Sequence, residues 1–112
     1  MAKPLFKNYT YSFDKNETKL LINFCNQAVK QMQTDQRFVL DIKSFNSIVD
    51  KLQTDSSNVK LTKDEQKRLV GQLKENKKYI ESQMAKSWFF KRWLLKTLLV
   101  QYNNIISSHF SD

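Results

Sequence analysis

The chain has 112 residues, of which 40% are hydrophobic and 27% charged, and its formal net charge is +8 at pH 7. This is the composition of a soluble globular domain, and it excludes disordered, fibrous and membrane-spanning classes. The single glycine and single proline predict an all-α fold, because sheet-rich folds need many tight turns and tight turns draw on both residues. We expect an antiparallel four-helix bundle with a short extended N-terminal arm.

The N-terminal arm, residues 1–13, has a pattern of its own. Tyr9, Tyr11 and Phe13 alternate with polar residues, which is typical of an extended strand. We find no second strand for it, so we expect the arm to lie across the helices without a ladder of hydrogen bonds. Pairing with the same arm of a second copy, in a homodimer, is the alternative. Residues 14–112 are expected to form a single helical domain.

Helix caps and amphipathic spacing predict the helices. Asp14 with Glu17, and Thr62 with Glu65, have the spacing of capping boxes, in which side chains bond the exposed backbone N–H groups of a first turn. We predict helices near residues 15–33, 36–53, 63–85 and 87–108. Their apolar faces place four representative residues in the core: Phe24, Phe45, Leu73 and Leu98.

The boundary between the third and fourth helices is predicted at residues 85–87, which contain no helix breaker. We place a turn there because one helix over 63–108 would be about 70 Å long at 1.5 Å per residue, with no packing partner in the same chain. A continuous helix would instead indicate a dimer.

On its edge beside the apolar face, the third helix carries a stripe of lysines. Its members are Lys63, Lys67, Lys74 and Lys78, with Lys77 flanking them. Residues 57–112 hold 11 cations and five anions, so this half of the chain is basic and suits an anionic surface such as phosphates. A solvated face diluted by Glu75 and Glu81 is the alternative. No helix-turn-helix signature accompanies the stripe.

The fourth helix has two apolar arcs. The main arc is expected to face the core and holds Trp88, Leu94, Leu95, Leu98, Leu99, Tyr102, Ile105 and Ile106. A second, smaller arc holds Phe89, Trp93 and Val100, and the cations Arg92 and Lys96 lie between the two. Such a helix is either central in a bundle or has a second partner. In the second case these five residues form a docking surface for a protein or a membrane interface.

Catalytic groups are scarce in the sequence. His109 is the only histidine, and Cys25 lies at the centre of an apolar helix face, where free cysteines behave as small hydrophobic residues. No metal-ligand spacing, glycine-rich phosphate loop or nucleophile elbow is present. We expect a protein that is not an enzyme and that carries no metal or cofactor.

The expected function is that of a small non-enzymatic helical binding or regulatory module with an unidentified protein partner. The alternative is a basic binder of an anionic membrane surface or nucleic-acid backbone. In size, charge and helix count the chain is similar to bacteriocin immunity proteins, and that likeness belongs to the alternative. A lone cysteine and the lack of an apolar signal run at the first residues predict a cytoplasmic location.

Overall fold

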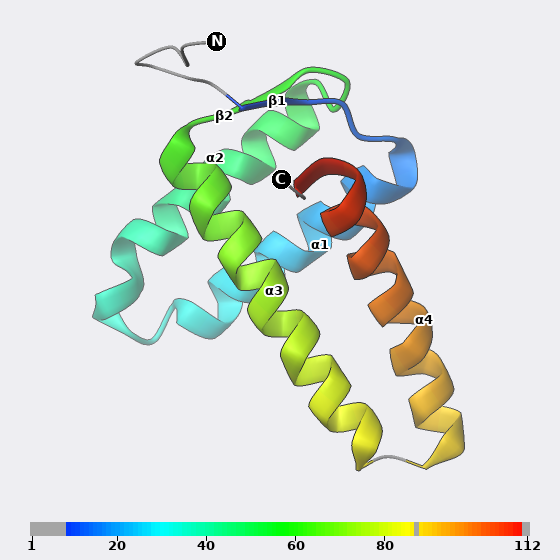
Figure 1. Cartoon of the computed structure of the whole chain (residues 1–112). Helices are drawn as coiled ribbons and strands as arrows, with labels where there is room; N and C mark the ends of the chain where they lie inside the picture. The colour runs from blue at the N-terminus through cyan, green and yellow to red at the C-terminus, as the bar shows by residue number, and fades with distance from the viewer. Residues whose placement is uncertain (1–8, 87, 111–112) are drawn as a thin grey trace, which may run out of the picture. The chain divides into compact units, whose positions relative to one another are not determined.

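The computed structural model describes residues 9–86 and 88–110, without the side chains of Phe89 and Phe90. These residues form four α-helices and two short strands, which confirms the all-α class and the extended N-terminal arm (Figure 1). Residues 1–8 of the predicted arm lie outside the described part. The chain divides into two compact units, Met1–Arg68 and Leu69–Asp112, which are described separately. A single domain over 14–112 therefore stays a prediction.

The first unit contains two long helices that pack on each other and a two-stranded sheet. A short 3₁₀ turn joins the helices, and the third helix begins at the end of this unit. The elements in chain order are β1 (Tyr9–Tyr11), α1 (Lys15–Met32), η1 (Gln36–Phe38), α2 (Val39–Thr54), β2 (Val59–Leu61) and the start of α3 (Lys63–Ala85).

Helix α1 begins at the predicted capping box. The Glu17 N–H donates to Asp14 Oδ1 at 2.7 Å, and the Asp14 N–H donates to Glu17 Oε1 at 3.0 Å. Residues three and four apart then lie on one buried face, as an amphipathic helix requires. The members of this face are Leu21, Phe24, Cys25, Ala28, Val29 and Met32.

The expectation that the N-terminal arm lacks a partner strand is wrong. β1 pairs antiparallel with β2, with Tyr9 opposite Leu61 and Tyr11 opposite Val59 (Figure 1). The sequence pattern does not reveal this partner because it is only three residues long and follows a loop directly. A period of two cannot be recognised over so short a segment.

Burial explains why β2 forms at all. Val59 and Leu61 are buried while Lys60, between them, is exposed, so the strand covers the helices with its apolar side. Beyond the ladder, the Phe13 N–H donates to the Ser56 carbonyl at 2.8 Å, and the Phe13 ring is buried. The arm is thus held by backbone hydrogen bonds as well as by aromatic packing.

A single carboxylate joins β2, α2 and the first turn of α3. Glu65 is 6% exposed, and its Oε1 accepts from the Thr62 N–H at 2.9 Å and from Lys51 Nζ at 2.5 Å. The Glu65 N–H donates in turn to Thr62 Oγ1 at 3.1 Å, which completes the predicted capping box. Arg68 adds a second connection through ion pairs with Asp41 and Asp64.

The second unit is a helical hairpin made by α3 and α4 (Phe89–Ile105), which run antiparallel (Figure 1). The predicted break near 85–87 is confirmed, since α3 ends at Ala85. α4 ends three residues before the predicted end, and a π turn, η2 (Ile106–Phe110), follows it. Within the unit, Asn76 Nδ2 donates to the Tyr102 hydroxyl at 3.1 Å and joins the two helices.

Three of the four representative core residues are buried, and the fourth is not. Phe24, Phe45 and Leu73 are buried, whereas Leu98 is only half-buried. The prediction for Leu98 is wrong because the fully buried positions of α4 and η2 lie nearer the C-terminal end, at Tyr102, Ile105 and Phe110. A helical wheel treats all turns of a helix alike and cannot show this difference.

The Glu65 carboxylate gives a prediction for stability. Glu65→Gln removes the negative charge from the hydrogen bonds that the carboxylate accepts. We therefore expect it to lower the free energy of unfolding by about 1.5–3 kcal/mol in urea melts at neutral pH. Glu75→Gln, at an exposed carboxylate of the same helix, is the control and should change stability by less than about 0.5 kcal/mol. Equal effects of the two variants would contradict the role of Glu65.

The same group predicts a pH dependence. Burial acts to raise the pKa of Glu65, but hydrogen bonds from Lys51, Ser47 and the Thr62 N–H, with the Lys51 charge, hold that pKa below its ordinary value of 4.5. Its stabilising effect is therefore fully present above pH 4.5 and is lost as the pH falls through the lowered pKa. We expect Glu65→Gln to lose less stability on acidification than the wild type, as measured by urea midpoints.

The buried thiol of Cys25 predicts how the stability of the protein changes at alkaline pH. Burial raises the pKa of its thiol from 9.0 to about 12. Because the unfolded chain ionises its thiol above pH 9.0, the contribution of Cys25 is complete below that pH and is lost as the pH rises toward 12. Cys25→Ala should cost roughly 1 kcal/mol or somewhat more at neutral pH. The stability difference between Cys25→Ala and the wild type should therefore narrow as the pH rises above 9.0, and a constant difference would contradict the assignment.

Candidate functional site

Cys25 and His109, the two residues with the side chains most often used in nucleophilic or acid–base chemistry, lie in different helical segments. Cys25 is buried at the centre of α1, and with a pKa of about 12 its thiol stays protonated at neutral pH. His109 is half-buried in η2. Among the described residues, no three His, Cys, Asp or Glu side chains gather as metal ligands would.

The second apolar arc of α4 faces solvent. Trp93 is 63% exposed and Val100 48% exposed, and their spacing of seven residues places them on one face of the helix. Lys96 is also exposed and lies between them along this face. The side chain of Phe89, the remaining apolar member of the predicted arc, is outside the described part of the structure. We call Arg92, Trp93, Lys96 and Val100 the α4 face.

Two members of the α4 face have defined local contacts. Arg92 Nε donates to the Met84 carbonyl at 3.3 Å, so this arginine holds the end of α3 against the start of α4. The carbonyl of Trp93 accepts from Thr97 Oγ1 at 3.1 Å, a bond within the helix that leaves the indole ring free to meet another molecule. The face is thus carried on a regular helix rather than on a loop.

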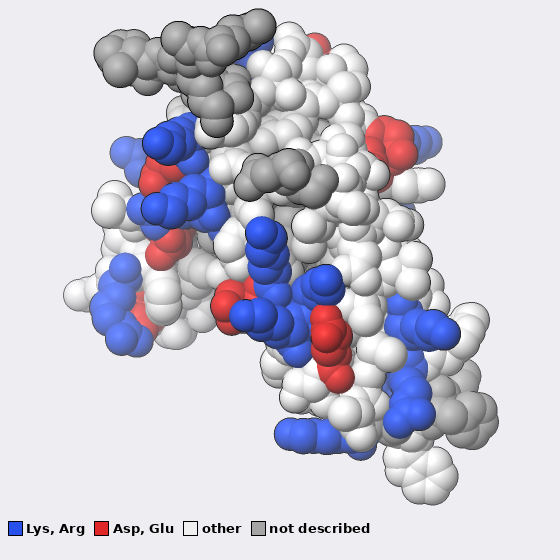
Figure 2. Space-filling model, viewed as in Figure 1, with Lys and Arg blue, Asp and Glu red and all other residues white. Residues whose placement is uncertain are grey.

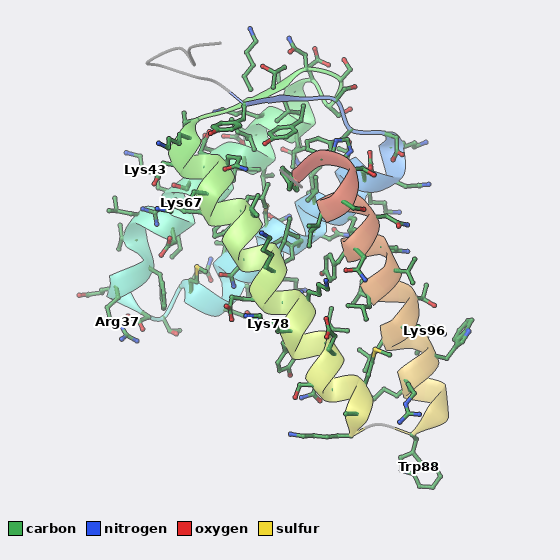
Figure 3. All side chains as sticks on the ribbon, in the orientation of Figure 1. Arg37, Lys43, Lys67, Lys78, Trp88 and Lys96 are labelled. Carbon is green, nitrogen blue, oxygen red and sulfur yellow. The ribbon has the colours of Figure 1, made fainter. Side chains whose placement is uncertain are left out.

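Two residues that the helical wheel assigned to the core are exposed instead. Trp88 is 85% exposed and Leu94 50% exposed, so their predicted burial is wrong. Trp88 is the N-cap of α4, with extended backbone angles (φ −64°, ψ 158°), and its side chain does not follow the helical period. It points away from both helices at the end of the hairpin (Figure 3). Leu94 lies at the edge of the main arc, where a wheel cannot decide between core and solvent.

The charge around these aromatic residues has one sign. From Ser82 to Ser111 the sequence has four lysine and arginine residues and no aspartate or glutamate. All four, Lys86, Lys91, Arg92 and Lys96, are exposed. On the side that Figure 2 shows, the lower part of α4 carries basic groups without an acidic neighbour. This basic segment could have been recognised in the sequence, because no aspartate or glutamate occurs from Ser82 to Ser111.

The lysine stripe of α3 is also on the surface, but its charge is mixed. Lys63, Lys67, Lys74 and Lys78 are exposed, while Lys77 is half-buried. Figure 3 labels two members of the stripe, Lys67 and Lys78. Gly71 fills the gap in the stripe, and a Cβ built there would meet nothing within 4 Å. Glu75 and Glu81 are exposed on the same helix, and Figure 2 shows acidic groups beside the basic ones over α3. The field of this stripe is accordingly weaker than that of the α4 segment.

Comparison with known proteins adds no relative: no protein-family model, curated protein or solved structure matches this chain. Within residues 9–86 and 88–110, no helix combines the length and the apolar character needed to cross a bilayer.

The exposure of Trp93 makes a direct prediction for folding. Trp93→Ala should change the free energy of unfolding by less than about 0.5 kcal/mol, because little of the indole is packed. Tyr102→Ala, at a buried aromatic of the same helix, should cost about 3 kcal/mol or more. Thermal or urea melts of the two variants compare them directly. A large loss from Trp93→Ala would show that the indole is packed in solution.

Proposed function

We propose that this chain is a non-enzymatic cytoplasmic binding module that docks on a larger partner through the α4 face. The observation that carries the proposal is Trp93, a large aromatic side chain that is 63% exposed between cations on a regular helix. Aromatic and arginine residues are the side chains most enriched at binding hot spots. The lone, buried cysteine fits the reducing compartment that the proposal assumes.

The size of the indole explains why a partner would matter. A tryptophan side chain buries about 150–250 Å² when it is covered, and each Å² is worth about 25 cal/mol. Covering the exposed part of Trp93 therefore contributes roughly 3 kcal/mol to binding. An exposed ion pair contributes about 0–1 kcal/mol, so the aromatic residue supplies the larger share of affinity.

Two classes of partner fit the α4 face. A protein partner is the first candidate, because aromatic residues and arginine are enriched at protein interfaces and the rim of an interface is polar. An anionic surface, of a membrane or a nucleic acid, is the second candidate. The lack of any acidic residue from Ser82 to Ser111 favours it specifically. The α3 stripe, with Glu75 and Glu81 among its lysines, supports this second candidate less strongly.

Photo-crosslinking in the native cell tests the docking role whatever the chemical class of the partner. A benzophenone amino acid replaces Trp93 in one variant and Leu40, which is 65% exposed on α2, in a matched control. We expect position 93 to give defined adducts and position 40 to give none above background. The adduct identifies the partner class: a protein, a lipid, a nucleic acid or a second copy of the chain.

The control at position 40 defines the result that would contradict the proposal. Positions 93 and 40 have nearly equal exposure, so random collisions label both to the same extent. Equal adduct yields from the two positions, in folded variants, would contradict a docking role for the α4 face.

A further inference from the structure

Both tryptophans of the chain lie at one end of the α3–α4 hairpin. The sequence contains two tryptophans, Trp88 and Trp93, and they are 85% and 63% exposed. Trp93 is five positions after Trp88, which corresponds to about 7 Å along a helix axis. Leu94, 50% exposed, lies at the same level. The start of α4 therefore presents three large apolar side chains to solvent.

These apolar side chains point in different directions around the helix. Leu94 follows Trp93 directly, so the two are turned by about 100° from one another, and Trp88 projects from the end of the hairpin (Figure 3). A rigid protein surface that lies along the α4 face would cover Trp93 and leave Leu94 in water. A fluid headgroup layer that surrounds the end of the hairpin covers all three.

The cations occupy the level at which anionic headgroups would lie. Lys86, Lys91, Arg92 and Lys96 fall within eleven residues that also contain both tryptophans. Among the described residues, none of the three lysines forms an ion pair with an acidic side chain. Long basic side chains extend toward headgroups while indole rings settle at the boundary between headgroups and acyl chains.

The backbone at this end of the hairpin is electropositive, like the lysine and arginine side chains around it. Trp88 is the N-cap of α4, and an indole has no acceptor with which to cap the first N–H groups of the helix. The positive end of the α4 dipole is thus directed out of the hairpin, where phosphate oxygens bind well. The carbonyl end of α3 lies beside it, but there Met84 accepts from Arg92, and Gln83 accepts from the Lys86 N–H at 3.2 Å.

From these observations we propose that the end of the α3–α4 hairpin rests on an anionic phospholipid bilayer. Trp88, Trp93 and Leu94 enter the headgroup region, and Lys86, Lys91, Arg92 and Lys96 contact its phosphates and anionic headgroups. The inference rests on the proposed function and names the partner of the same face. It describes peripheral attachment, as amphipathic basic and aromatic helices show, and needs no spanning segment. The negatively charged cytoplasmic leaflet is the matching surface.

Tryptophan fluorescence of the full chain reports on this site alone, because its only two tryptophans lie in it. The protein is titrated with vesicles of phosphatidylcholine and with vesicles of phosphatidylcholine mixed with phosphatidylglycerol. We expect a blue shift with the anionic vesicles and none with pure phosphatidylcholine. The shift should fall as salt rises beyond about 0.1 M, where the Debye length is about 10 Å.

Paired lysine variants separate local contact from net charge. Lys91→Gln with Lys96→Gln should weaken binding to anionic vesicles by roughly 30-fold, since each cation at such a surface is worth about fivefold. Lys30→Gln with Lys43→Gln lowers the net charge by the same amount at exposed positions of α1 and α2. This control should weaken binding by no more than about threefold, because it removes two charges that do not belong to the proposed contact. Circular dichroism confirms that both proteins fold.

An aromatic pair tests the insertion itself. Trp93→Ala should weaken vesicle binding by roughly tenfold, as expected when an exposed indole is covered only in part. Leu40→Ala, at an exposed leucine of the first unit, should leave vesicle binding unchanged. Equal effects of the two substitutions would contradict insertion through the end of the hairpin.

The outcomes that overturn the inference are distinct from those that overturn the proposed function. If folded protein gives no blue shift with anionic vesicles but position 93 crosslinks to a protein, the bilayer is wrong and the docking role stands. If both lysine pairs weaken vesicle binding equally, attraction is by net charge and the inference fails. Binding of a DNA duplex that depends on Lys91 and Lys96, without vesicle binding, replaces the bilayer by nucleic acid. Absence of any specific adduct at position 93 removes the proposed function.

Discussion

The first unit depends on the Glu65 carboxylate. Its Oε1 accepts hydrogen bonds from the Thr62 N–H and from Lys51 Nζ. This one oxygen atom therefore caps the first turn of α3 and bonds it to α2. The segment that connects α2 to α3 is short and contains β2. Val59 and Leu61 of β2 are buried, and β2 is the partner strand of the N-terminal arm. A buried carboxylate is tolerated here because a cation and a backbone N–H both bond it.

In the second unit, buried residues and exposed aromatic residues lie at opposite ends of one helix. The C-terminal part of α4 and the turn that follows contribute the buried residues Tyr102, Ile105 and Phe110, and Asn76 bonds the Tyr102 hydroxyl. The opposite end carries Trp88 and Trp93 in solvent. Substitutions at the exposed end should therefore test the proposed binding with little effect on the buried residues at the other end.

Local features of the fold could be predicted from the sequence. The two capping boxes, at Asp14 with Glu17 and at Thr62 with Glu65, form as their spacing indicates, because their partners lie within one turn. The turn after Ala85 is predicted correctly without any helix breaker, because two amphipathic helices need a packing partner. The exposed pair Trp93 and Val100 is recognisable as a second arc, although the pattern alone allows either burial or exposure.

The sequence by itself determined the all-α class, the four helices, the capping boxes of α1 and α3 and the absence of acids around the aromatic end of α4. Each of these is set by neighbours within a few residues or by composition. Only the tertiary structure decided the β1–β2 pairing, the Lys51–Glu65 contact and the exposure of Trp88 and Leu94. The pairing and the ion pair join residues far apart in the chain, whose meeting depends on how the helices pack. The exposure of a side chain depends on whether another element packs against its turn of the helix. The helical period is the same for every turn, so the sequence pattern cannot show this.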